Sequence, residues 1–387
     1  MGVEKLIERK LIMLPGPTNV PDRVLNSMIK PIINHRGPEF RKLYQEITEN
    51  LKYLFQTQSD VFILSTSGTG GIECAISNIV EPNDKVLVPV FGIFSERLKE
   101  KIKRRGGVPI ELNLEWGTAP KASEIKEILE KEPDVKAIAM VYNETSTGVT
   151  VRELPKIGEI AKEKGILLIV DAISILGGDK LPVDEWNIDI CIGGSQKCIA
   201  CPPGLAVVSV SQKAWETIEK TKNKPMYFDL TRMQEYAERK ETPFTPALPI
   251  FYALNEALEI IKEEGLEKRF QRHKKCAEAF YAALEKLGLT AFPKDRTTRS
   301  NTVIAVNVPT GVDNAKVREI MREKYKIVIA GGIGELKPKI FRIGCMGIIS
   351  QAEVLMTINA LENALMDVGY NVNLGIGTAT AREIFKS

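Results

Sequence analysis

The chain has very little histidine and too few cysteines to organise a fold. Its 387 residues include two histidines, His35 and His273, and six cysteines. Histidine is the commonest catalytic metal ligand and the usual base of a hydrolytic triad, so this scarcity argues against both kinds of site. Six cysteines in a chain of this length are typical of reduced thiols and not of a disulfide framework.

An excess of one charge and long apolar runs are also missing. The chain has 53 Lys and Arg against 50 Asp and Glu, so its formal net charge is +3. That balance, without a basic block, predicts no nucleic-acid partner and no membrane surface. No apolar run approaches the length of a membrane span, and Met1–Leu6 has no apolar signal core, so we expect a cytoplasmic protein.

One Cys-x-x-C pair, Cys198 and Cys201, is present. A zinc or redox site would need a second cysteine pair or a thioredoxin-like context, and neither is found in the sequence. We interpret these two residues, and Cys345, as small side chains that fill crowded positions, and we expect no metal.

A glycine-rich turn follows an early strand-like run. Val61–Leu64 leads into residues 65–71, Ser-Thr-Ser-Gly-Thr-Gly-Gly, and then into a helical pattern. There is no Gly-Lys-Ser/Thr, which excludes a P-loop, and Glu73 stands where a dinucleotide fingerprint has its third glycine. Glycines at a helix start let an anion approach free N–H groups, and Ser67 and Thr69 add hydroxyl donors. On its own, this segment fits either a phosphate cup or an ordinary strand–helix turn.

Apolar strands alternate with amphipathic helices from about residue 61 to residue 210. Most of the strand candidates are continuous apolar runs, which is typical of parallel strands buried on both faces. The pattern predicts a doubly wound α/β domain with a mostly parallel, seven-stranded sheet. The strand candidates are Val61–Leu64, Lys85–Val90, Pro109–Leu114, Ala137–Tyr142, Ile166–Val170, Ile188–Gly193 and Leu205–Val210, and the helices between them include Ala122–Glu130 and Leu154–Lys164.

The carboxyl-terminal part of the chain has a different pattern. We predict an amino-terminal arm over residues 1–18, a large domain over 19–262 and a smaller α/β domain over 263–387, with the arm joining the small domain in space. The elements expected in the small domain are a charged helix over about 265–287, strands Thr302–Val308 and Ile327–Ala330, a helix Asn314–Lys324, and the last long helix, which begins with the capping box Ser350–Glu353.

An acid and an amine stand at the ends of two apolar runs. Asp171 follows Ile166–Val170, and Lys197 closes the strand-like segment Asp189–Lys197. About one βαβ crossover separates them, and the carboxyl ends of parallel strands form the ligand crevice of such a sheet, so both should face one site. This pair suits pyridoxal phosphate, because an amine forms the Schiff base and a carboxylate partners the ring nitrogen. A solvated lysine and an aspartate that caps a helix are the alternatives.

Several motifs follow one another almost from end to end of the chain. They are Pro15-Gly16-Pro17-Thr18, Ser67-Gly68-Thr69-Gly70, Val170-Asp171-Ala172-Ile173-Ser174 with Gly177-Gly178, Gly194-Ser195-Gln196-Lys197 with Pro202-Pro203-Gly204, and Phe341-Arg342-Ile343-Gly344. In this order the chain resembles the class V, fold-type I aminotransferases, and within them the alanine/serine–glyoxylate branch. The resemblance implies a fold-type I pyridoxal-phosphate transferase with pyridoxal 5'-phosphate as cofactor.

The resemblance also implies a role for each motif residue. Lys197 would carry the Schiff base and move the proton between substrate and cofactor, and Asp171 would bind the pyridine nitrogen. Gly16 and Arg342 would bind the α-carboxylate of the substrate. The other cofactor-binding residues that it implies are Ser67, Gly68, Thr69 and Gln196 at the phosphate, Phe94 stacked on the ring, Thr145 at the ring hydroxyl, and Thr245, which would reach the phosphate of the other subunit in a homodimer with shared active sites.

Two places depart from the family pattern or have no role in it. Thr242 stands where many relatives carry tyrosine, which leaves open one expected phosphate donor. His35 and Arg36 match a pattern near the entrance of the site without an assigned chemistry. Arg36 is a candidate to bind a second acidic group on the substrate.

The activity implied is ping-pong transfer of an amino group from alanine or serine to glyoxylate or pyruvate. Aspartate, phosphoserine or aminoethylphosphonate transaminases of the same family are alternatives. A cysteine desulfurase or lyase is a further alternative, but it needs a reactive cysteine on a mobile loop, and Gln196 stands where such enzymes usually have histidine. A regulatory protein that only holds the cofactor is a third class, and no DNA-binding segment supports it.

Overall fold

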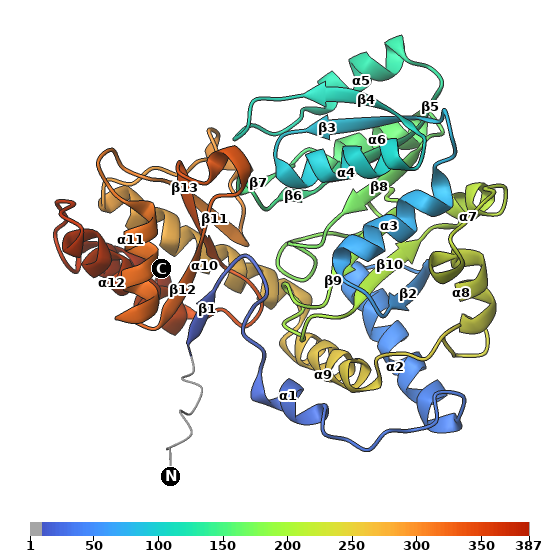
Figure 1. The fold of residues 1–387 in the computed structure, drawn as a ribbon, viewed down its shortest axis with the longest axis horizontal. Helices are drawn as coiled ribbons and strands as arrows, with labels where there is room; N and C mark the ends of the chain where they lie inside the picture. The colour runs from blue at the N-terminus through green and yellow to red at the C-terminus, as the bar shows by residue number, and fades with distance from the viewer. Residues whose placement is uncertain (1–9, 387) are drawn as a thin grey trace.

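The computed structural model describes residues 10–386, which form two sheets, each with its own helices (Figure 1). Between them, these residues also contain one short hairpin, β6 (Asn143–Glu144) with β7 (Val149–Thr150). Within the described residues, no helix is both long and apolar enough to cross a membrane.

A seven-stranded sheet forms the centre of the larger domain. Its order is β2-β10-β9-β8-β5-β3-β4, and only β10 runs antiparallel to its neighbours, so the predicted mostly parallel sheet is confirmed. Every residue of β8, β9 and β10 is buried, which explains why these segments are continuous apolar runs. The strands are β2 (Asp60–Leu64), β3 (Lys85–Val90), β4 (Val108–Asn113), β5 (Val135–Val141), β8 (Leu167–Asp171), β9 (Ile190–Gly194) and β10 (Ala206–Val210).

Helices surround this sheet and bring two helix N-termini to its carboxyl edge. Helix α3 packs on β9 and β10, and α4 packs on β3 and β5. The helices are α1 (Asp22–Ser27), α2 (Pro38–Phe55), α3 (Gly68–Ile79), α4 (Ile93–Arg104), α5 (Ala122–Lys131), α6 (Leu154–Glu163), α7 (Gln212–Ile218), α8 (Leu230–Ala237) and α9 (Leu248–Glu264), with a 3-10 turn, η1 (Met226–Phe228).

The connection between β8 and β9 differs from the expected βαβ crossover. Residues 172–189 contain no helix and run as a series of turns. Gly177, Gly178 and Pro182 interrupt any helical pattern here. At Gly177 the backbone has φ +83°, and a Cβ at Gly178 would lie 2.6 Å from the Cys198 sulfur. Because of these glycines, the connection can pack closely against the loop that carries Lys197.

A four-stranded sheet forms the smaller domain, in the order β1-β12-β13-β11. Strand β1 runs parallel to β12, so the amino-terminal arm joins this sheet beside the carboxyl-terminal strands, as Figure 1 shows. The elements are β1 (Leu11–Met13), α10 (Leu266–Lys286), η2 (Arg296–Thr298), β11 (Val303–Asn307), α11 (Asn314–Glu323), β12 (Ile327–Gly331), η3 (Gly334–Leu336), β13 (Ile340–Gly344), α12 (Gln351–Asp367) and α13 (Ile376–Lys386).

The start of α12 confirms a sequence prediction. Ser350 and Glu353 form the expected capping box, in which the Ser350 amide donates to the Glu353 carboxylate at 2.9 Å. Helix α12, with 17 residues, is the last long helix, and a shorter helix of 11 residues, α13, follows it after a turn.

The division into domains remains our proposal: an arm over 1–18, a large domain over 19–262 and a small domain over 263–387. The break between α9 and α10 at Gly265, where φ is +79°, supports it. So does the packing, since one buried cluster runs from Val24 to Leu266, and a second contains Met13 and residues between Cys276 and Ala381.

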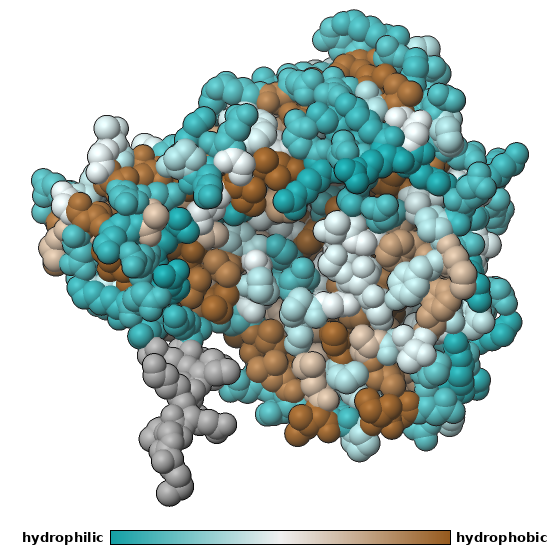
Figure 2. Space-filling model, viewed as in Figure 1, coloured by the Kyte–Doolittle hydropathy of each residue, from teal (hydrophilic) through white to brown (hydrophobic). Residues whose placement is uncertain are grey.

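Apolar side chains are exposed beside α1. Ile29 and Ile32 follow this helix and are 85% and 69% exposed, and Leu25 within it is 44% exposed. Figure 2 shows brown, apolar residues along the edge of the molecule where α1 and the following segment lie. The short turn η1 adds Met226, which is 68% exposed.

Candidate active site

A cavity of about 150 Å³ lies at the carboxyl edge of the seven-stranded sheet. The segments that line it follow β2, β5, β8 and β9 or begin α3 and α4. This is the edge at which a parallel sheet binds its ligands. The predicted cofactor-binding residues in its wall are Ser67, Gly68, Thr69, Phe94, Thr145, Asp171, Gln196 and Lys197.

Lys197 lies in a tight loop after β9. Its Nζ donates a hydrogen bond to the carbonyl of Pro15, so the amino-terminal arm reaches the site. Gly16, with φ +96°, passes so close that a Cβ there would collide with the lysine side chain. Burial lowers the pKa of Lys197 from 10.5 to about 8, and the positive charge of Arg342 acts in the same direction. An appreciable fraction of this amine is therefore neutral near pH 8.

Asp171 is the last residue of β8 and is 6% exposed. One carboxylate oxygen accepts the Ile173 amide at 2.9 Å. Burial raises the pKa of Asp171 to about 7, and the nearby carboxylate of Glu144 adds to the rise. Among residues 10–386, no ion pair neutralises either Asp171 or Lys197. A cationic ring nitrogen would supply the partner that this buried acid lacks.

The start of α3 fits a phosphate group. The first amides of a helix have no partner within it, and the Ser67 side chain makes no capping bond to them. At Gly68, a Cβ would lie 2.7 Å from Ile173, so only glycine leaves this approach open. Gln196 has a buried side-chain oxygen without a partner in the described residues. Because the two ends of an amide are interchangeable by rotation, this group can offer its NH₂ to an anion.

Phe94 and Thr145 also line the cavity, and they come from two separate elements. Phe94 is in the first turn of α4, and its half-buried ring faces the cavity. Thr145 is at the turn of the β6–β7 hairpin and is 5% exposed. Neighbouring Asn143 donates to Ser174 at 2.8 Å and accepts from Thr150 at 2.6 Å, which fixes this hairpin against the loop after Asp171.

Arg342 reaches the site from β13 of the smaller domain. It donates to the carbonyls of Thr145 and Gly331, each at 3.0 Å. Burial lowers its pKa to about 10, so the side chain remains a cation at neutral pH. The two bonds use two of five N–H donors and leave others for a carboxylate ligand.

Three predicted site residues, Gly16, Arg342 and Thr245, are not part of the cavity wall, and Thr242 also lies outside it. Thr245 is exposed, in a separate shallow hollow that also contains Tyr227 and Phe244. Its place neither supports nor opposes a role in a second subunit. The Thr242 hydroxyl donates to the Phe244 carbonyl at 2.8 Å, within its own loop.

Arg36 is bound to the same loop. Its guanidinium donates to Glu241 at 2.9 Å and to the Thr242 carbonyl at 2.6 Å. These contacts commit Arg36 to holding the loop in the single chain and not to the cavity.

The sequence reasoning missed two cations in the cavity wall, Arg97 and Lys101. They lie on the face of α4 that also carries Phe94, so the i, i+3 and i, i+7 spacing was the signal that could have identified them. Lys101 pairs with Glu73 at 3.0 Å. Arg97 lies over the Phe94 ring, with its guanidinium carbon 5.1 Å from the ring centroid.

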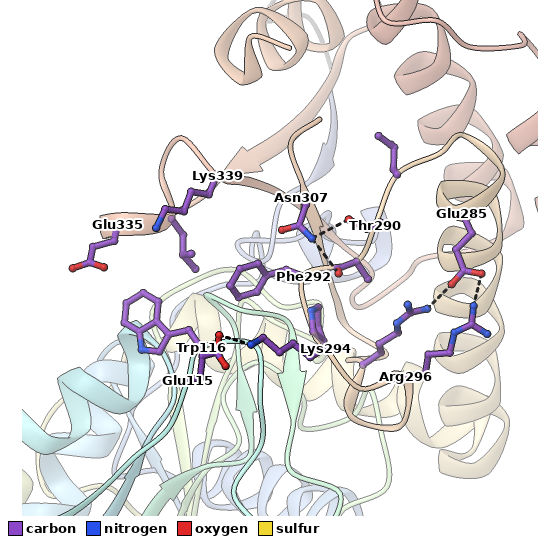
Figure 3. Close-up of a pocket in the computed structure, with 15 residues that line it drawn as sticks. Glu115, Trp116, Glu285, Thr290, Phe292, Lys294, Arg296, Asn307, Glu335 and Lys339 are labelled. Carbon is purple, nitrogen blue, oxygen red and sulfur yellow. Dashed lines mark hydrogen bonds and ion pairs between the residues drawn. The ribbon is translucent and has the colours of Figure 1, made fainter. Parts of the chain in front are cut away.

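A larger hollow, of about 850 Å³, lies between the two domains and contains none of the predicted site residues. Trp116 and Phe292 flank it, as Figure 3 shows. Several of its charges are paired within the wall: Lys294 with Glu115, and Arg296 with Glu285 at 2.7 Å. The smaller cavity, with unpaired buried groups and shifted pKa values, is the better candidate for chemistry.

The fold and the cavity together define the class of protein. The seven-stranded sheet with an amine and an acid at its carboxyl edge is the arrangement of fold-type I enzymes that use pyridoxal phosphate. The family profile described as aminotransferase class-V matches residues 14–349, and the chain belongs to this family.

Relatives and solved structures agree with this assignment. An uncharacterized aminotransferase of Methanocaldococcus jannaschii is 46% identical and covers 97% of both chains. Serine–glyoxylate aminotransferase of Methylorubrum extorquens is 36% identical over 96% of this chain and 95% of its own. The crystal structure of ureidoglycine–glyoxylate aminotransferase from Bacillus subtilis has a TM-score of 0.94 at 33% identity, with 100% of each chain covered.

The protein is therefore a transaminase, and its cofactor is pyridoxal 5'-phosphate. The residues present fit this group. Within residues 10–386, Asp171 is a buried acid that no ion pair neutralises and Gln196 has an amide oxygen without a hydrogen-bond partner, while Gly68 opens the start of α3.

Proposed function

We propose that this transaminase moves the amino group of a small amino acid, alanine or serine, to glyoxylate or pyruvate by ping-pong chemistry, with Lys197 as the Schiff-base residue. The observation that carries the proposal is the unpaired couple Lys197 and Asp171 in one buried cavity, with both pKa values moved toward neutrality. Groups tuned in this way suit proton transfer near neutral pH.

Each residue has a distinct task in this proposal. Pyridoxal phosphate, when bound, supplies an aldehyde that takes the amino group and a ring that accepts the electron pair of the substrate Cα. Asp171 holds the proton at the ring nitrogen by a charge-assisted hydrogen bond. Lys197, as a neutral amine, would accept the proton from the substrate Cα and return it to the former aldehyde carbon of the cofactor, on the other side of the transferred nitrogen.

The remaining tasks are binding and orientation. Ser67, Gly68, Thr69 and Gln196 would hold the phosphate, and Phe94 and Thr145 would fix the plane of the ring. Arg342 would pair with the α-carboxylate beside the backbone of Gly16. The half-buried Lys197 is held next to Gly16, which keeps the amine and the carboxylate site close together.

The choice of a small substrate rests on two observations. Arg36, the candidate for a second acidic group, is bound to Glu241 and to a backbone carbonyl. The compared enzymes of M. extorquens and B. subtilis are named for serine and ureidoglycine, each with glyoxylate. A transaminase for aspartate, phosphoserine or aminoethylphosphonate is the alternative, and Arg97 is the cation in the cavity wall that would then face the second acidic group.

We propose that the enzyme acts in the cytoplasm as a homodimer with shared active sites. The exposed Ile29 and Ile32 beside α1 support an interface, because neighbouring exposed apolar side chains mark interaction sites. In that dimer, Thr245 would reach the phosphate of the other subunit. The free thiols of all six cysteines fit a reducing compartment. Light scattering on a sizing column should give twice the chain mass.

A half-reaction screen tests the function. The purified enzyme with its cofactor is mixed with one amino acid at a time, and loss of the visible cofactor band is followed. We expect alanine or serine to remove the band, and glyoxylate or pyruvate to restore it. Loss of the band with aspartate or phosphoserine alone would assign the alternative donor, and sulfide release from cysteine without transfer would overturn the proposal.

A further inference from the structure

A buried carboxylate stands between the cofactor cavity and the first turn of α4. Glu144, in the β6–β7 hairpin, is 0% exposed. One of its oxygens accepts the amides of Phe94 at 3.2 Å and Ser146 at 3.1 Å. The other accepts the Ser95 amide at 2.9 Å. The hydroxyls of Ser95 and Ser146 add two more bonds, at 3.1 and 2.6 Å.

The same short segment completes the cap of α4. The Ser146 hydroxyl accepts the amide of Ile93 at 2.9 Å. The first three amides of the helix are thus bound by side chains from residues 144–146. Gly92 precedes the helix, and a Cβ there would collide with the Glu144 side chain. Because Gly92 has no side chain, the Glu144 carboxylate can approach the first amides of α4.

Residues held by Glu144 or next to it face the ligand. Phe94, whose amide it accepts, presents its ring to the cavity. Thr145 follows it in the chain, lines the cavity, and accepts a bond from Arg342 through its carbonyl. The charge of Glu144 also acts on Asp171 and on Arg342, which lie on different sides of the site.

We propose that Glu144 is a positioning residue of the active site, which fixes the ring of Phe94 and the Thr145–Arg342 contact relative to the cofactor. The proposal rests on the transaminase function above, since it assigns Phe94 to the cofactor ring and Arg342 to the substrate carboxylate. Glu144 itself touches neither group in this assignment and acts through the residues it holds.

The contacts require a carboxylate and not merely a polar side chain. Three of the five donors are backbone amides, which cannot rotate to accept a bond. A glutamine has the same shape, but its NH₂ would face at least one of these amides, because both carboxylate oxygens accept one. The two serine hydroxyls could turn to accept, so the mismatch is confined to the backbone amides of Phe94 and Ser146 on one side or of Ser95 on the other.

The small domain contains a matched control. Glu362 of α12 is also 0% exposed, and its carboxylate accepts the amides of Gly377 at 2.6 Å and Thr378 at 3.1 Å, at the start of α13. It therefore caps a helix in the same way, but it is not part of the cavity wall. Glu362→Gln measures what a glutamine in such a cap costs the fold alone.

The experiment compares Glu144→Gln with Glu362→Gln in the full chain. The midpoint temperature of thermal unfolding, measured without cofactor, should fall by a similar amount in both variants. Only Glu144→Gln should weaken pyridoxal phosphate binding, by about tenfold in the dissociation constant, because one charge-assisted cap is lost beside the ring. The pH at which the bound cofactor changes its absorbance should also fall, since a nearby negative charge favours proton-bound forms.

Equal losses of stability in the two variants, with unchanged cofactor affinity and unchanged absorbance pH, would overturn the proposal. If Glu144→Gln does not fold, Ser146→Ala removes two of the contacts with less disturbance, and the same two readouts decide. Neither readout needs an amino-acid substrate. If the half-reaction screen fails, the proposed amino donors are wrong, but the result of the Glu144 experiment is unaffected.

Discussion

Two clusters of buried charge flank the loop that carries Lys197, and they are built in opposite ways. In the cavity, Lys197 and Asp171 have no ion-pair partner in residues 10–386. At the junction of α9 and α10, Arg269 is 1% exposed but donates to Glu264 at 2.7 Å and to the carbonyls of Gly177 and Cys198 at 2.9 and 2.6 Å. The charges of the first cluster have hydrogen bonds to the backbone but no ion pair, whereas the second cluster combines an ion pair with hydrogen bonds to carbonyls.

The pKa values reflect this difference. Burial moves Lys197 down to about 8 and Asp171 up to about 7, so each is near the point where it changes charge. At the junction, Arg272 and Arg269 hold the pKa of Glu264 below its usual value, which keeps that group ionised. We infer that the unpaired cluster serves chemistry at some cost in stability, while the paired cluster serves stability.

Replacing Lys197 should give the largest effect and the clearest test of this contrast. In Lys197→Ala the amine is absent, so turnover and the visible band of the covalently held cofactor should both be lost. The cofactor-free protein should melt at the same temperature as the wild type or higher, because a buried, unpaired amine is removed. Steady-state kinetics and calorimetry measure the two. Full activity in this variant would end the assignment of Lys197.

Replacing Arg269 should give the opposite result. Arg269→Met leaves two buried carbonyls without a donor and weakens the hold on Glu264, so we expect a loss of about 3 kcal/mol in unfolding free energy. Activity per folded molecule should change by less than about tenfold, because Arg269 does not line the cavity. A denaturant titration together with kcat tests this. If Arg269→Met is stable but inactive, Arg269 serves catalysis and the two clusters do not have separate roles.

The contrast also shows what sequence could and could not reveal. Asp171 and Lys197 were predictable because each follows a continuous apolar strand, and the mostly parallel sheet brings the ends of such strands together. The strands Lys85–Val90 and Ile327–Gly331 were predictable to within one residue, because each is a short, nearly continuous apolar run.

The contacts that depend on several elements at once could not be read from the sequence. Glu144 caps α4 from a hairpin about fifty residues further along the chain, and Arg269 reaches a loop more than ninety residues away. No periodicity links such positions. The spacing of Asp171 and Lys197 predicts a βαβ crossover, but residues 172–189 form turns, since Gly177, Gly178 and Pro182 disfavour a helix there.

Asp171→Asn should give a smaller effect on turnover than Lys197→Ala. An amide cannot hold the proton at the ring nitrogen as a charge-assisted partner, and the loss of such a bond corresponds to about 10- to 100-fold in kcat. The rate of band loss with excess amino acid measures it. A kcat within twofold of the wild type would mean that Asp171 does not contact the ring.

The pH dependence of the stability of Asp171→Asn tests how much the buried Asp171 carboxylate destabilises the fold. Burial raises the folded pKa of Asp171 to about 7, above its unfolded value, so its contribution to stability is complete below the unfolded pKa and is lost as pH rises through 7. Cofactor-free Asp171→Asn should therefore melt a few degrees above the wild type at pH 8 and at an equal temperature near pH 4. Equal melting at both pH values would contradict the raised pKa.

Ser67→Ala should give the smallest effect and the most local one. Ser67 precedes α3 without capping it, so its hydroxyl is free for a phosphate, and its loss should weaken pyridoxal phosphate binding by about 3- to 10-fold. Pyridoxal, which lacks the phosphate, is the matched ligand, and its affinity for the cofactor-free enzyme should be unchanged. Because the hydroxyl makes no cap, melting of the cofactor-free variant should shift by less than about a degree. Equal weakening of both ligands would place the phosphate elsewhere than at the start of α3.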